Sequence, residues 1–528
     1  MDTQDSLFGR LEQLNDVGAS LSGERNLDRL LEKILQAAMS ITHADGGTLY
    51  MVSDDQRRLQ FRIVRTLSMG IAFGGSSSAS LPPQFTDLPL YMDDGSPNDH
   101  MVAAHVVITG ATANIADAYT DENFDFSGTI RFDRATGYRS RSFLTVPLRD
   151  HESTIIGVLQ LINATHPSSG EVHPFSTADQ RLAESLASQA AVALTNRRLM
   201  LQLENLFEAF VKLIDDAIDE KSAYTGGHCE RVPELTMMLA EAVNQTTEGP
   251  LAGFQLTDKD RYELRIAALL HDCGKVTTPV HVVDKATKLQ TIFDRIELLD
   301  TRFEVVARDA EIAALRAVAA GQPREQAQAE LDRVRRQIQD DRQFLHRVNQ
   351  GGESLDDASV QRIAEISERY PWTDPSGERR PFLTADEIEN LSIRAGTLTA
   401  SEREVINHHI VSTIHMLENL PWPRHLANVP EYAGGHHERM DGKGYPRGLT
   451  REQMSVQARI MGIADIFEAL TAADRPYKPS MKLSQALAIM QRFRDNGHID
   501  PDLYEVFLAK GVPRQYGERF LKPEQIDI

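Results

Sequence analysis

The stretch from Ser176 to Thr225 contains neither glycine nor proline, and this constrains the fold of the chain more than any other feature. Its first half carries small and apolar residues at helical spacing, namely Leu182, Leu186, Ala190 and Ala193. A serine or threonine at position 176 or 177 is a typical helix cap. The pattern therefore predicts one long connecting helix over residues 176–222, which divides the chain into two differently patterned parts.

The second half of this helix has apolar residues that alternate spacings of four and three: Leu199, Leu203, Leu206, Phe210, Leu213 and Ala217. This is the seam of a parallel coiled coil. The alternative is one helix packed inside a monomer. We favour a homodimer, because a chain that joins a sensor to an effector needs mechanical coupling.

The part before this helix has a mixed pattern. An amphipathic helix around Leu30 and Ile34 is followed by a strand-like run at residues 47–52. Residues 155–163 are a strong strand candidate, and the Ser- and Pro-containing piece at 165–170 is a loop. We therefore expect an α+β sensor domain over residues 27–196, preceded by a helix or tail at residues 1–26.

Composition limits the function classes. With 528 residues, 41% hydrophobic and 25% charged, the chain has the make-up of a folded multidomain protein. A net charge of -21 opposes nucleic-acid binding, because phosphate backbones would be repelled. The two cysteines and the lack of a long apolar run predict no membrane span and a cytoplasmic location.

The chemistry is concentrated after the connecting helix. Residues 436–446 join two imidazoles, at His436 and His437, to two carboxylates and a turn. Neutral imidazoles are common ligands for divalent transition metals. Because Gly442, Gly444 and Pro446 oppose a continuing helix, the ligands should lie at a helix-to-loop junction.

A second motif, residues 271–275, follows the apolar run 266–270 and so places His271 and Asp272 at a buried helix end. A carboxylate has two oxygens and can bridge two metals, while the neighbouring histidine binds one. Lys275 is close enough to counter a phosphate charge. Cys229 and Cys273 follow candidate ligands, but packing is the first interpretation for both.

Three more segments complete a pattern: residues 224–232 with His228, residues 404–411 with His409, and residues 463–470 with Asp465. Together with the two motifs above, they resemble the HD-GYP family over about residues 205–290 and 397–528. That family is a branch of the metal-dependent HD phosphohydrolases, whose members hydrolyse cyclic di-GMP. The resemblance implies an all-α HD-superfamily catalytic domain, which we place at residues 205–528.

The resemblance also implies the roles of individual residues. The metal ligands would be His228, His271, Asp272, His409, His436, His437 and Asp465. Asp272 and Lys275 would be catalytic, and Lys275, Arg475 and Lys478 would hold the substrate. The GYP loop, Gly444, Tyr445 and Pro446, would contact diguanylate cyclases of the GGDEF type.

Two divalent ions are expected. Histidine and carboxylate ligands favour iron or manganese over structural zinc, which often takes cysteine. Some family members hold a third metal through a glutamate, but Tyr224 occupies that position here, and only nearby Glu220 offers an alternative ligand. The expected nucleophile is a water between the two ions, not a side chain.

The amino-terminal part is similar to GAF domains, through residues 114–119, 136–144 and 146–148. Such domains bind small molecules or mediate dimerisation, and both interpretations stay open. Asn163, Phe175 and Asp179 match a signature of cyclic-nucleotide-binding members, but Ala164 replaces its lysine. We therefore expect Asp179 to lack its ion-pair partner.

Residues 291–395 interrupt the family pattern. Residues 311–319 and 324–348 are charged and free of glycine, and the segment 320–323 between them breaks a helix. This predicts a helical hairpin within an insertion.

The leading interpretation is a GAF-regulated phosphodiesterase that hydrolyses cyclic di-GMP to pGpG, GMP or both. One alternative is a cyclic di-GMP receptor with little or no turnover. Another is an HD phosphohydrolase that acts on a different cyclic dinucleotide.

Overall fold

The computed structural model describes residues 2–24, 26–76, 80–83, 85–221, 227–352, 354–374, 376–472 and 480–528. The chain forms two compact units, Met1–Phe207 and Glu208–Ile528. None of the helices in the described residues is long and apolar enough to cross a membrane.

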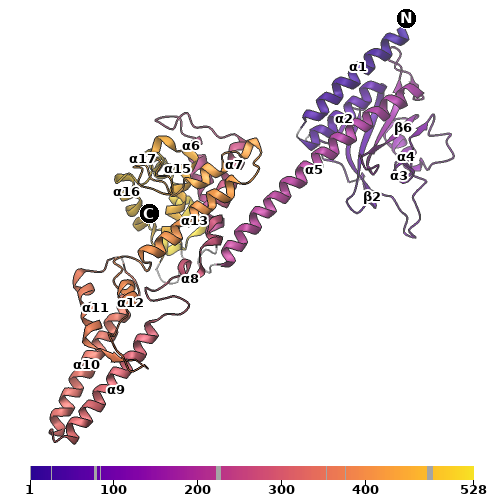
Figure 1. Ribbon diagram of the computed structural model, residues 1–528. Coiled ribbons are helices and arrows are strands. Elements are labelled where there is room, and N and C mark those ends of the chain that lie inside the picture. The colour runs from indigo at the N-terminus through magenta and orange to yellow at the C-terminus, as the bar shows by residue number, and fades with distance from the viewer. Residues whose placement is uncertain are drawn as a thin grey trace. The chain divides into compact units, whose positions relative to one another are not determined.

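The amino-terminal unit is an α+β structure, as predicted (Figure 1). Its strands are β1 (Ala44–Val52), β2 (Arg58–Thr66), β3 (Ile71–Gly74), β4 (Leu88–Pro89), β5 (Ala113–Ile115), β6 (Phe143–Arg149), β7 (Ile155–Thr165) and β8 (Val172–His173). They form an antiparallel sheet of order β3-β2-β1-β7-β6-β5, with β4 beside β2 and β8 beside β7. The strand expected at residues 155–163 is β7, the central partner of β1.

Helices cover both faces of this sheet. They are α1 (Asp2–Gly23), α2 (Leu27–Thr42), α3 (Val102–Thr109), α4 (Ser127–Thr136) and the first part of α5 (Thr177–Lys221). Leu49 of β1 joins a core shared with α1, α2 and α5, whereas its neighbour Tyr50 joins a core shared with α3. Successive strand residues point to opposite faces, so one strand serves both cores.

Helix α5 confirms the prediction from the glycine-free and proline-free run. It begins after Ser176, whose hydroxyl accepts from the backbone N–H of Asp179 over 3.1 Å, and it continues to Lys221. The predicted seam residues Leu199, Leu203, Leu206, Phe210 and Leu213 are 51 to 67% exposed in the single chain.

The expectation that Asp179 lacks a partner is wrong. Arg10 of α1 forms an ion pair with its carboxylate, and the Ser176 N–H donates to the same group over 2.8 Å. The cation that Ala164 cannot provide comes instead from a helix 169 positions away in the sequence. Asp179 is therefore buried as a paired charge.

The carboxy-terminal unit is helical. Apart from the segment between α8 and α13, it contains α6 (His228–Asn244), α7 (Asp258–Leu270), η1 (Cys273–Thr277), α8 (Val280–Val283), α13 (Ala400–Glu418), η2 (Arg424–Leu426), α14 (Val429–Gly434), η3 (Arg451–Gln453), α15 (Val456–Thr471), α16 (Leu483–Asp495), α17 (Pro501–Ala509), α18 (Val512–Phe520) and η4 (Pro523–Gln525). Helix α6 packs against α7 and α15, and α13 packs against η1 and α14. These contacts bring the ends of several helices to one place.

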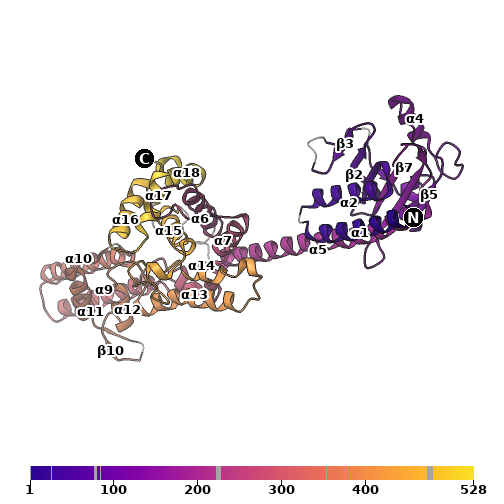
Figure 2. The ribbon, with the colours of Figure 1, turned by 90° about the horizontal axis from the view of Figure 1, so that it is seen from above.

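The predicted hairpin is present as α9 (Ile296–Ala319) and α10 (Arg324–Asn349), which lie side by side in Figures 1 and 2. The segment also contains α11 (Asp357–Arg369), β9 (Trp372–Thr373), β10 (Arg379–Arg380) and α12 (Ala385–Leu391). It has its own apolar core, which includes Leu299, Phe303, Leu345 and Phe382. Lys285, just before this segment, donates to Glu402 of α13 over 2.7 Å and so attaches the base of the segment to α13.

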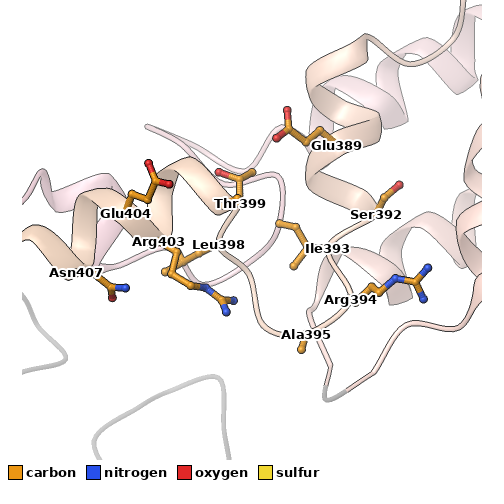
Figure 3. A pocket seen from close by; sticks show the side chains of 11 residues that line it. Glu389, Ser392, Ile393, Arg394, Ala395, Leu398, Thr399, Arg403, Glu404 and Asn407 are labelled. Carbon is orange, nitrogen blue, oxygen red and sulfur yellow. The ribbon is translucent and has the colours of Figure 1, made fainter. Parts of the chain in front are cut away.

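A cavity lies where this segment returns to α13 (Figure 3). It is lined by Glu389 and residues 392–395 on one side and by residues from the first turns of α13, including Arg403 and Asn407, on the other. None of the predicted site residues lines it. It is therefore separate from the candidate site.

We expect Arg10→Gln to lower the free energy of unfolding of the amino-terminal unit by about 1 to 3 kcal/mol, because Asp179 would keep its burial and lose its cation. The free energy of unfolding is measured by urea denaturation, with hydrogen exchange of the amides in β1 and β7 as the readout. The matched control is Arg198→Gln, which breaks an exposed pair with Asp54 and should change stability by less than about 0.5 kcal/mol. Equal effects of the two variants would contradict the role given to Arg10.

Candidate metal centre

The structure brings together all seven side chains predicted as metal ligands. Helix ends supply most of them: His228 is the first residue of α6, His271 follows the last residue of α7, and His436 and His437 follow α14. Asp272 precedes η1, His409 lies within α13 and Asp465 within α15. The expected helix-to-loop junction at His436 is confirmed.

Six of these residues form two clusters, each with its potential ligand atoms within 4.8 Å of one another. The first cluster is His228, His271 and Asp272, and the second is His409, His436 and His437. All of them except His437 are buried. Each cluster could hold a metal ion.

Asp272 lies between the two clusters. Its Oδ2 is 3.3 Å from Nε2 of His228 and 3.3 Å from Nε2 of His271. Its Oδ1 is 3.2 Å from Nε2 of His409 in the second cluster. The two oxygens of one carboxylate therefore face different clusters, which is the geometry that a bridging ligand requires.

Asp465 adds a second carboxylate on the side of the first cluster. Its Oδ1 lies 3.4 Å from Nε2 of His228 and 3.9 Å from Nε2 of His271. The first cluster therefore combines two imidazoles with oxygens from two carboxylates, a mixed donor set that suits iron or manganese.

The backbone orients three of the imidazoles in the same way. Nδ1 donates to the carbonyl three residues earlier in His271 (to Ala268, 2.7 Å), His409 (to Ile406, 2.6 Å) and His436 (to Ala433, 2.6 Å). A carbonyl only accepts, so Nδ1 carries the proton and Nε2 offers a lone pair to the site.

Several buried atoms at the centre have no hydrogen-bond partner among the described residues: Nε2 of His228, His271 and His436, and Oδ1 of Asp272. Buried polar atoms are normally paired, because leaving one unpaired costs free energy. Four such atoms converging on one place fit a site built for metal ions.

The protonation states favour this use. Burial lowers the pKa of His436 well below its ordinary value and that of His437 to about 4, so both are neutral near pH 7. Burial alone would raise the pKa of Asp272, but the Lys275 ammonium and the nearby imidazoles hold it well below its usual range. Burial alone would also lower the pKa of His228, but the carboxylates around it raise this pKa well above its ordinary value. Metal binding there would therefore release a proton.

Lys275 forms an ion pair with Oδ2 of Asp272, so its ammonium lies beside the first cluster. The loop that carries it also contacts α5, because Lys221 donates to the carbonyls of Lys275 and Val276. Gly274 allows this loop to approach α13. A Cβ at Gly274 would lie 2.0 Å from the carbonyl oxygen of His409.

The GYP loop supports His437. The ring of Tyr445 stacks on the imidazole of His437, with ring centroids 4.8 Å apart and planes at 21°. A Cβ at Gly444 would lie 2.4 Å from the backbone nitrogen of Arg439, so only glycine fits there. Glu438 closes the loop, since its carboxylate accepts from the backbone N–H of Arg447 over 2.7 Å.

Two contributing residues were not predicted. Glu468 accepts from Nδ1 of His228 over 2.5 Å and from Nε of Arg231 over 2.7 Å. The sequence could have indicated both residues. Arg231 and Glu468 each follow a predicted ligand by three residues on a helix, so each lies on the same helix face as that ligand.

Six residues named in the sequence analysis need separate comment. Arg475, Lys478 and Tyr224 lie outside the described residues. Glu220 is exposed on α5 and belongs to neither cluster. Both cysteines are buried without a disulfide, and burial raises the pKa of Cys273 to about 11. Neither cysteine belongs to a cluster, so packing remains the better interpretation for both.

Family comparisons agree with this division of the chain. The GAF domain family matches residues 26–194. HD domain families match residues 225–337 and 384–503. The two HD matches contain every predicted metal ligand.

Characterised relatives match the carboxy-terminal unit in part. The chain is 38% identical over 120 residues to a 3'3'-cGAMP-specific phosphodiesterase of Vibrio cholerae, which is 23% of this chain and 27% of that protein. A second such enzyme of Vibrio cholerae is 40% identical over 21% of this chain and 23% of its own length. A cyclic di-GMP phosphodiesterase of Pseudomonas aeruginosa is 37% identical over 22% of this chain and 28% of its own length. The chain thus spans about a quarter of the length of these relatives.

We expect Gly274→Ala to weaken Mn²⁺ binding by at least about tenfold, because the added methyl group must push η1 away from α13 and so separate Asp272 from His409. Calorimetric titration of the metal-free protein with Mn²⁺ measures the change. Gly253→Ala is the matched control, since nothing lies within 4 Å of a Cβ at that position. Unchanged Mn²⁺ binding in Gly274→Ala would contradict the need for this close approach.

Proposed function

We propose that this chain, in which an N-terminal GAF domain precedes an HD domain, is a metal-dependent phosphodiesterase that hydrolyses a cyclic dinucleotide. The observation that carries the proposal is the placement of Asp272, with one oxygen toward each of two clusters that could hold metal ions. Two-metal sites of this kind catalyse displacement at phosphorus.

Cyclic di-GMP is the substrate that we favour, with pGpG, GMP or both as products. The support is the sequence resemblance and the cyclic di-GMP phosphodiesterases among the relatives. A second candidate is 3'3'-cGAMP, because two relatives of similar identity are named for that substrate. Both molecules present the same phosphodiester to the site and differ in one base.

In this proposal, different residues bind the metal ions and offset the charge of the substrate phosphate. Two divalent ions, when bound, supply positive charge and an activated water for attack on the phosphodiester. His228, His271, Asp272, His409, His436, His437 and Asp465 would hold them. Lys275 places an ammonium beside Asp272, where it offsets phosphate charge as well as carboxylate charge. Burial of the site keeps these electrostatic interactions strong.

Iron or manganese is the metal that we propose, because the described donors are imidazoles and carboxylates. We assign a two-metal site. We also assign Arg475 and Lys478 to substrate binding, on the sequence resemblance alone.

In the alternative, the protein is a receptor that uses the same site to bind the dinucleotide but not to hydrolyse it. It would bind the dinucleotide and transmit its presence through α5, whose end contacts the loop of Lys275. Complete ligand clusters favour the enzyme.

We propose the domain limits given by the sequence: a sensor domain at 27–196, a connecting helix at 176–222, a catalytic domain at 205–528 and an insertion at 291–395. The sensor would regulate the catalytic domain, with or without a small-molecule ligand. The exposed Pro446 and Arg447 make the GYP loop accessible to a partner, and we assign GGDEF-type cyclases to it.

The chain acts as a homodimer in this proposal. Five large apolar side chains that alternate spacings of four and three along α5 are more than half exposed in the single chain. A second copy in parallel register would bury them as the core of a coiled coil.

The variants His271→Ala and Asp272→Ala should each lower hydrolysis of cyclic di-GMP by about three orders of magnitude, because each removes a ligand from the first cluster. Chromatography identifies the products, and elemental analysis after anaerobic purification reports the metals. His281→Ala changes an exposed histidine of α8 and should keep full activity. Activity retained in both ligand variants would refute the assignment.

The same assay with 3'3'-cGAMP separates the remaining candidates. A higher kcat/KM for that dinucleotide would replace cyclic di-GMP as the substrate. If metal-loaded protein binds either dinucleotide tightly but forms no product, the chain is a receptor and not an enzyme.

The double variant Leu203→Asp, Leu213→Asp should convert the dimer to a monomer, since two charges would enter the centre of the coiled coil. Size-exclusion chromatography with light scattering gives the mass. Lys212→Asp places an aspartate on the same helix but off the seam, and this variant should remain dimeric. A dimeric double variant would show that the seam is not the interface.

A further inference from the structure

One of the site histidines is held differently from its neighbours. Nδ1 of His271, His409 and His436 each donates to a backbone carbonyl three residues earlier. His228 is the first residue of α6, so no turn of its own helix precedes it. Its orientation must therefore come from another element.

Glu468 of α15 supplies this orientation. Its Oε2 accepts from Nδ1 of His228 over 2.5 Å, and this points Nε2 of the same ring toward Asp272 (3.3 Å) and Asp465 (3.4 Å). The Glu468 side chain is 1% exposed, so water does not compete for the contact.

Arg231 completes the arrangement. Its Nε donates to Oε1 of Glu468 over 2.7 Å, so each carboxylate oxygen has its own partner. Arg231 lies one turn after His228 on α6, and Glu468 lies one turn after Asp465 on α15. The two helices thus contact each other through two successive turns. The first turn carries His228 and Asp465, which lie at the metal clusters, and the second carries Arg231 and Glu468, which support the first. The guanidinium also balances the buried charge of Glu468.

We infer that Glu468 is a positioning residue for His228 and sets the affinity of the first cluster for its metal ion. The inference rests on the proposed metal-dependent function. A carboxylate behind a ligating imidazole fixes the ring and makes it a stronger donor than a carbonyl does. The first cluster has only two imidazoles, so its affinity for a metal ion would depend most on a stronger imidazole donor.

Titration of metal-free protein with Mn²⁺ alone, by calorimetry, tests the inference. We expect Glu468→Gln to weaken the binding of one of two ions by about 10- to 100-fold. A glutamine can accept from His228 with its oxygen, but its NH₂ group then faces the Arg231 donor, so it cannot satisfy both partners. Electron paramagnetic resonance of the half-loaded variant should show an isolated Mn²⁺ in place of a coupled pair.

Two further variants distinguish positioning from a general structural role. Glu263→Gln is the matched control, because Glu263 is also buried and its carboxylate accepts from the backbone N–H of Asn428 over 2.7 Å, away from both clusters. It should bind Mn²⁺ as the wild type does. Glu468→Asp keeps the charge but withdraws it by one methylene, so its affinity should lie between those of the wild type and Glu468→Gln.

The outcomes are separable from those of the proposed function, because Mn²⁺ binding needs no dinucleotide. Wild-type affinity in Glu468→Gln would overturn the inference, as would equal weakening in the Gln and Asp variants. If Glu468→Gln does not fold, the Asp variant decides: unchanged Mn²⁺ affinity overturns the inference, and weaker binding of one of the two ions supports it. A wild type that binds two ions but hydrolyses no cyclic dinucleotide would refute the proposed function alone. A wild type that binds no Mn²⁺ would refute both.

Discussion

The carboxylate of Asp272 is the group on which the rest of the carboxy-terminal unit depends. It is 2% exposed, and its two oxygens approach imidazoles from three different helices or their ends. A buried carboxylate costs much free energy unless cations or donors surround it. Lys275 meets part of this requirement, and the convergent Nε2 atoms that have no hydrogen-bond partner among the described residues are consistent with metal ions meeting the remainder. The packing of α6, α7, α13 and α15 can be understood as the means of holding these groups around one side chain.

Helix ends make this arrangement possible. His271 and His436 follow the last residues of α7 and α14, where the preceding turn offers a carbonyl to Nδ1 and leaves Nε2 free. His228 begins a helix and needs Glu468 instead. Close approach of the elements then depends on small residues, since a side chain at Gly274 would collide with the backbone of His409. The site is thus built from backbone geometry as much as from ligand identity.

The segment between α8 and α13 is long, yet it leaves the candidate site intact. It lies between Asp272 and His409 in the sequence, yet it has a separate apolar core, and it is attached at its base by Lys285 and Glu402. Lys288 reinforces that base, because its buried ammonium donates to the carbonyls of Leu391 and Ile393. The two ends of this segment therefore stay together, and α13 keeps its place beside η1.

Local pattern was enough to predict several elements and the ligands at residues 271–272 and 436–437, whereas the family resemblance supplied His228, His409 and Asp465. The glycine-free run predicted α5, the apolar run before His271 predicted a buried helix end, and the breaker at 320–323 predicted the hairpin. Only the tertiary structure showed that Arg10 pairs with Asp179, that Tyr445 stacks on His437, and that Glu468 supports His228. Periodicity and turn residues act over a few positions, and so they can be recognised along the chain. The partner of a buried charge depends on which side chains folding brings within about 3 Å, and the residues that matter here are 169 and 240 positions apart.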